Sequence, residues 1–80
     1  MNKFERELDQ RVKDLQNLKR LDERRVKEST KALRRARKDG VLHVISKAEN
    51  NLRDDEGGLK KTKADLKVAK QALREFRAGR

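Results

Sequence analysis

The sequence predicts an all-α protein folded as one long antiparallel helical hairpin with coiled-coil-like packing. Apolar residues recur in steps of three and four through nearly the whole chain. There is no proline among the 80 residues to interrupt a helix. The strongest turn signal, Asp39-Gly40, falls at the midpoint. With 32% hydrophobic and 48% charged residues the composition alone would favour disorder, but this periodicity favours folded helices.

The first helix is expected over about residues 2–38. Asn2 can cap its N-terminus, and Glu5 three residues later completes a capping-box pattern. Basic residues before the Asp39-Gly40 turn suit the negative C-terminal end. Its core-facing positions are Phe4, Leu8, Val12, Leu15, Val26, Leu33 and Ala36.

The second helix is expected over about residues 41–78. Its core-facing positions are Val41, Ile45, Ala48, Leu52, Leu59, Thr62, Leu66, Ala69, Leu73 and Phe76. Gly57-Gly58 is a weak point, because two glycines cost a helix about 2 kcal/mol relative to alanine. Two alternatives stay open at this stage. The glycines could form a second turn and give three helices, or the helix could begin near Ser46, where Ser46 and Glu49 form another capping-box pattern.

The two apolar series share one register, in which the numbers of facing residues sum to 81. Leu15 then faces Leu66. The other expected layers are Leu8 with Leu73, Val12 with Ala69, Leu33 with Ala48, Ala36 with Ile45, Asp22 with Leu59 and Ser29 with Leu52. Near the centre Lys19, Asp22 and Asp55 occupy core positions, either as a polar layer that fixes the register or as a splayed, hydrated part of the hairpin.

A single hairpin buries one stripe per helix, which rarely stabilises a monomer of this size. Several apolar residues lie beside the seam, and they predict a second seam for a partner helix rather than scattered surface residues. The simplest assembly is a homodimer that forms a four-helix bundle. The residues of this predicted partner or dimer seam are Leu18, Leu21, Leu42, Val44 and Val68, with Ala72 beside them.

The formal net charge of +10 is concentrated in two stretches of Lys and Arg at helical spacing. Such stripes either bind a polyanion or form the solvated side of a basic helix. The first stripe is Arg24, Lys27, Lys31, Arg34, Arg35 and Lys38; the second is Lys60, Lys63, Lys67, Lys70, Arg74 and Arg77. Both stripes, apart from Arg77 at the end, are the predicted nucleic-acid-binding residues.

The charge pattern favours binding to the phosphate backbone of duplex DNA or structured RNA. Single strands fit less well, because the chain has no Trp or Tyr and both Phe residues occupy seam positions. The alternative is a protein–protein adaptor, inhibitor or assembly factor that uses the second seam, or an acidic protein as partner, with no nucleic acid.

Catalysis is not expected, because His43 is the only histidine and there is no cysteine. No metal, cofactor or small-molecule substrate is expected either, since the run Asp54-Asp55-Glu56 diverges around a helix and matches no calcium loop. The start of the chain has acidic residues and no apolar run, which is unlike a signal peptide. With no apolar stretch of about 20 residues to span a membrane, we expect an intracellular, cytoplasmic protein.

Overall fold

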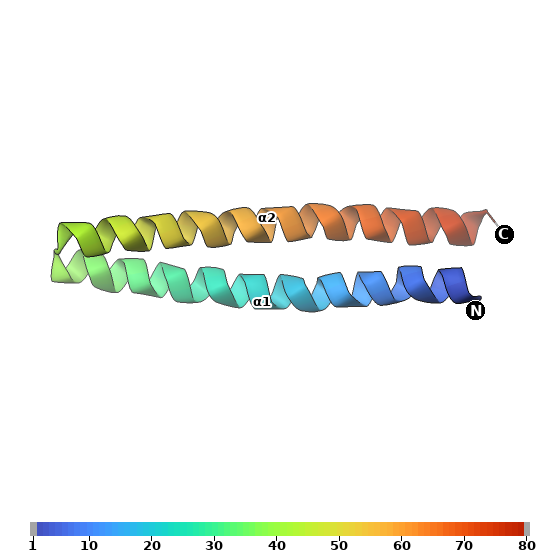
Figure 1. The fold of residues 1–80 in the computed structure, drawn as a ribbon, viewed down its shortest axis with the longest axis horizontal. Coiled ribbons are helices and arrows are strands. Elements are labelled where there is room, and N and C mark those ends of the chain that lie inside the picture. Colours follow the sequence, from blue (N-terminus) through green and yellow to red (C-terminus); the bar gives the residue numbers. More distant parts are fainter. Residues whose placement is uncertain (1, 80) are drawn as a thin grey trace.

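The computed structural model describes residues 2–79, which form two long helices packed side by side (Figure 1). Helix α1 spans Lys3–Asp39 and helix α2 spans Leu42–Ala78. They run antiparallel, so the hairpin is a rod with extents of 59 × 14 × 13 Å. The all-α hairpin is therefore confirmed, with helix bounds within about one residue of those expected.

The ends of α1 follow the expected capping chemistry. Asn2 Oδ1 accepts a hydrogen bond from the Glu5 backbone N–H at 2.8 Å. Gly40 has a φ of 77°, and its N–H donates to the Ala36 carbonyl at 3.0 Å. This left-handed conformation suits glycine and reverses the chain. Helix α2 begins at Leu42, directly after the extended Val41, so a start near Ser46 is wrong.

Helix α2 continues through Gly57 and Gly58 without a second turn, so the three-helix alternative is wrong. A Cβ atom added at either glycine would meet nothing within 4 Å inside the hairpin. The apolar positions keep their phase across the glycines, with Leu52 on one side and Leu59 on the other. Packing of this continuous stripe outweighs the low intrinsic propensity of the two residues.

The buried apolar residues form two clusters, one toward each end of the rod. The cluster near the termini contains Val12, Leu15, Leu66, Ala69 and Leu73, with Leu8 packed against it. The cluster near the turn contains Leu33, Ala36 and Ala48, with Ile45 and Leu52 packed against it. Both clusters join the residues that the register of 81 brings together.

A polar layer lies between the two clusters. The Thr62 hydroxyl donates to Asp22 Oδ2 at 2.6 Å, and the Ser29 hydroxyl donates to the Asp55 carboxylate. Asp22 is only 5% exposed, and Arg25 reaches its other oxygen at 3.5 Å. The splayed, hydrated alternative is therefore wrong at Asp22.

The polar partners differ from the pairs that the register of 81 assigns to these residues. Asp22 bonds to Thr62 rather than facing only Leu59, and Ser29 bonds to Asp55. Each polar partner lies three residues from the expected one. The reason is that hydroxyl and carboxylate groups reach along the seam to satisfy each other, since an unpaired buried carboxylate is costly.

The open end of the hairpin is closed by an aromatic contact and an ion-pair cluster. The rings of Phe4 and Phe76 lie 5.1 Å apart, between centroids. Arg77 lies 4.0 Å from the buried Glu5 carboxylate and 3.9 Å from Asp9.

Within residues 2–79 neither helix contains a stretch long and apolar enough to cross a membrane.

Candidate nucleic-acid interface

One side of the hairpin brings basic residues of both helices together. A surface hollow of about 240 Å³ is lined by Lys19 of α1 and by Lys63, Leu66, Lys67 and Lys70 of α2. An adjoining hollow of about 220 Å³ is lined by Gln16, Lys19, Arg20, Glu23, Leu66 and Lys70. We call this side the basic face. It joins Lys19 and Arg20 to the second stripe, which the sequence assigned to α2 alone.

The whole second stripe lies on the basic face. Residues seven apart on an α-helix are separated by about two turns and lie on nearly the same side. Steps of seven lead from Lys67 to Lys60 and Arg74, and from Lys70 to Lys63 and Arg77. A further hollow of about 300 Å³ is lined by Lys70, Leu73, Arg74 and Arg77. Because Arg77 already contacts two carboxylates, the cations of this stripe that are best placed for a ligand are Lys60, Lys63, Lys67, Lys70 and Arg74.

The first stripe spreads around the outside of α1 instead of facing one side. A hollow of about 300 Å³ is lined by Lys31, Arg34, Arg35 and Lys38. Steps of seven connect Arg24, Lys31 and Lys38 along the side of α1 that faces away from α2. The same steps place Lys27 and Arg34 in the row of Arg20, on the basic face, and Arg35 in the row of Leu21, on the opposite border.

The second stripe and part of the first, Lys27 and Arg34, form one basic track within a single hairpin. Near the termini the track follows α2 from Arg74 to Lys60, and it crosses to α1 where Lys63 and Lys67 share a hollow with Lys19. It then follows α1 through Arg20 and Lys27 to Arg34. Toward the turn, the row of Lys63 continues on α2 with the acidic Glu56 and Glu49, and the row of Lys60 continues with Arg53, so the track there lies mainly on α1.

Lys19 and Arg20 are the residues of this track that sequence reasoning missed. Lys19 stood at a core position in the apolar repeat, but in the structure it is half-buried at the rim of the seam, where it lines two of the hollows. Arg20 precedes Lys27 by seven residues, so the spacing that defined the first stripe contained a signal for it.

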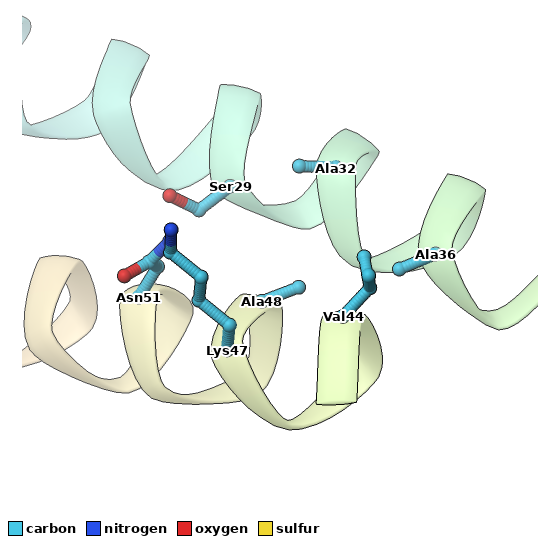
Figure 2. A pocket seen from close by; sticks show the side chains of 7 residues that line it. All are labelled: Ser29, Ala32, Ala36, Val44, Lys47, Ala48 and Asn51. Atoms are coloured by element: carbon cyan, nitrogen blue, oxygen red, sulfur yellow. The ribbon is translucent and has the colours of Figure 1, made fainter. Parts of the chain in front are cut away.

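The opposite side of the hairpin, which we call the apolar face, has a different character. Its hollow of about 210 Å³ is lined by Ser29, Ala32, Ala36, Val44, Lys47, Ala48 and Asn51. Figure 2 shows small side chains of the two helices meeting there, with Ala36 of α1 beside Val44 of α2. The floor of this hollow, near the turn of the hairpin, is therefore apolar.

Four of the five predicted seam residues share the apolar face. Steps of seven lead from Ala32 to Leu18 and from Lys47 to Val68, while Leu21 lies one turn from Leu18. Val68 is 69% exposed and Leu21 is 47% exposed. Leu42 does not join them, because steps of seven place it in the row of Lys63 and Lys70 on the basic face. It is the first residue of α2 and is 82% exposed.

The two faces present charged and apolar side chains. His43 is exposed in the first turn of α2. Within residues 2–79 no group of three His, Cys, Asp or Glu side chains is arranged to hold a metal ion. Comparison of the chain with protein-family models, curated proteins and solved structures gives no match.

Proposed function

We propose that this protein binds the phosphate backbone of duplex DNA or structured RNA through the basic track. The observation that carries the proposal is the hollow in which Lys19 joins Lys63, Lys67 and Lys70, because it brings basic residues of both helices together in one hairpin. Lys and Arg contacts to phosphate release condensed counterions, which gives affinity with little sequence preference.

The shape of the molecule favours a duplex over an unstructured single strand. The rod is 59 Å long, which corresponds to about 17 base pairs at about 3.4 Å per pair. Single-strand binding usually needs aromatic rings on which bases stack. The sequence has two aromatic side chains, Phe4 and Phe76, and their rings contact each other in a tilted arrangement at the open end.

Lys70 provides the sharpest test, because it lines three adjoining hollows of the basic face. Lys70→Glu should weaken duplex binding about tenfold at low salt. It should also reduce the slope of log K against log salt by about 0.9, the value of one lost phosphate contact. Fluorescence anisotropy with a labelled DNA duplex and a structured RNA, titrated with salt, measures both quantities.

Lys47→Glu is the matched control, because it changes the net charge equally but lies in the hollow of the apolar face. It should leave the salt slope unchanged. Equal losses in Lys70→Glu and Lys47→Glu would show that only net charge matters and would remove the basic track as a site. Absence of binding at about 50 mM salt would remove nucleic acid as the ligand.

The second candidate function is that of a protein–protein adaptor, inhibitor or assembly factor, and the exposed Leu21 and Val68 on the apolar face favour it. Apolar side chains at helical spacing suit a partner helix with complementary charge. An acidic protein in the same anisotropy series separates the two functions. Binding to that protein with no binding to duplex would favour the adaptor. Either function is proposed for a cytoplasmic protein, and neither assigns it catalysis.

A further inference from the structure

On the apolar face, Leu18 and Leu21 of α1 form a central apolar pair. The nearest charged residues at equal distances on the two sides of this pair have opposite signs. Along α1 this face carries Glu7, Arg11, Asp14, Leu18, Leu21, Arg25 and Glu28 in order. Reversing the order about the midpoint of the two leucines places Arg11 opposite Glu28 and Asp14 opposite Arg25, and it places Glu7 opposite Ala32. We propose that a second copy of the chain covers this face, with the two rods antiparallel, α1 packed on α1 and α2 packed on α2.

In this arrangement the α1 contacts are those whose numbers add to 39. Leu18 then packs on Leu21 of the second copy, and Arg11 meets its Glu28. Asp14 meets Arg25 in the same register. Each contact occurs twice because the dimer is two-fold symmetric. Antiparallel helices pack with a constant sum of this kind, and opposite charges facing across the contact set the register.

The α2 surface gives the same alignment independently. Contacts whose numbers add to 126 place Lys61 against Asp65 of the second copy, and Val68 against Gly58. Because Gly58 has no side chain, Val68 of the second copy can approach its backbone closely. A Cβ at Gly58 would meet nothing within its own hairpin, so packing inside the hairpin does not require a glycine there. The α2 contacts are centred on residue 63 and the α1 contacts between residues 19 and 20, close to where Thr62 and Asp22 bond across the hairpin.

A parallel face-to-face dimer would bring like charges together. It would set each α1 against α2 of the other copy at equal heights along the rod. Glu28 would then lie near Asp54, and Arg35 near Lys47. Like charges that face each other across an interface cost free energy and suppress the wrong arrangement. The antiparallel dimer covers Leu18, Leu21 and Val68 and sets opposite charges against each other at Arg11 with Glu28 and at Asp14 with Arg25.

The dimer has a consequence that rests on the proposed function. Because the apolar faces meet, the two basic tracks point outward on opposite sides of the four-helix bundle. One dimer therefore binds two separate duplexes and holds them side by side.

A charge swap at Arg11 and Glu28 tests the arrangement. Within one helix these residues are about 25 Å apart at about 1.5 Å per residue, so they do not interact in a single chain. Arg11→Glu or Glu28→Arg alone places two repulsive pairs in the dimer and should raise its dissociation constant about tenfold or more. The double variant R11E/E28R restores both pairs and should return it to within about threefold of wild type. Sedimentation equilibrium without nucleic acid measures all four proteins.

Leu18→Glu introduces a charge at the centre of the contact and should leave a helical monomer, with circular dichroism as the check of folding. A wild-type protein that stays monomeric at about 100 µM would overturn the proposal. A double variant as weak as the two single variants would also overturn the antiparallel register.

Energy transfer between donor-labelled and acceptor-labelled duplexes tests the bridging. Wild type and R11E/E28R should give transfer. Arg11→Glu and Glu28→Arg should each lose it at protein concentrations below their dissociation constants, although they change net charge in opposite directions. Duplex binding without transfer by the intact dimer would overturn bridging alone. An intact dimer that binds no duplex would instead overturn the proposed function and leave the dimer standing.

Discussion

At the scale of single residues, the bond between Asp22 and Thr62 decides how the middle of the hairpin holds together. The Asp22 carboxylate is buried and accepts a hydrogen bond from the Thr62 hydroxyl, with 2.6 Å between the two oxygens. An Arg25 guanidinium nitrogen lies 3.5 Å from its other oxygen. Removing one member of a buried pair costs more than replacing both with apolar groups, because the partner left behind stays desolvated.

Thr62→Val should therefore lower the free energy of unfolding by about 1–3 kcal/mol. The double variant D22L/T62V should recover most of this loss, since leucine and valine would join the two apolar clusters. Urea unfolding followed by circular dichroism at one fixed protein concentration measures the difference, because self-association shifts apparent stability.

Thr30→Val is a matched control, since the Thr30 hydroxyl donates only to the Val26 carbonyl of its own helix, at 2.8 Å. It should change stability by less than about 0.5 kcal/mol. A loss in Thr62→Val no larger than that of Thr30→Val would show that the bond between the helices contributes nothing to stability.

Residue spacing could predict that Asp22 points into the seam, because a repeat of apolar positions shows which side of a helix is buried. It could not predict Thr62 as the partner. Side chains at neighbouring layers are within reach of each other, and hydrogen-bond geometry chooses among them.

At the scale of the helices, the two central glycines and the turn glycine differ in whether the backbone requires a glycine. Gly57 lies within α2, with open space where a Cβ would be. Gly40 has a φ of 77°, which residues with a Cβ rarely adopt. In the sequence, both Gly57 and Gly40 look like helix-breaking residues. They differ only in that the spacing of apolar residues continues unchanged across Gly57.

Gly57→Ala should raise the free energy of unfolding by about 1 kcal/mol, because alanine has the higher helix propensity and meets no neighbour. Gly40→Ala should lower it by about 1–2 kcal/mol because of its left-handed backbone. Thermal unfolding monitored by circular dichroism compares them at equal concentration. A destabilised Gly57→Ala would show that α2 is not a regular helix at this point in solution.

At the scale of the whole molecule, the two faces of the hairpin differ: one gathers Lys and Arg from both helices, and the other carries the exposed Leu18, Leu21 and Val68 among charges of both signs. The fold was predictable because it depends on periodicity, which is local, and on one turn signal. The candidate site was predictable only in part. The stripes follow from spacing on each helix, but their junction at Lys19 depends on which sides of the two helices meet, and this is decided by packing.

A track that runs the length of one rod should make binding depend on duplex length. Each additional phosphate contact adds about 0.9 to the salt slope, so the slope should grow with duplex length and level off near about 17 base pairs, the length of a 59 Å rod. Anisotropy titrations with duplexes of about 8, 12, 17 and 24 base pairs, using Leu18→Glu to keep one hairpin per complex, measure this growth. A slope already constant at about 8 base pairs would mean that the rod crosses the duplex, and that a single stripe rather than the joined track makes the contact.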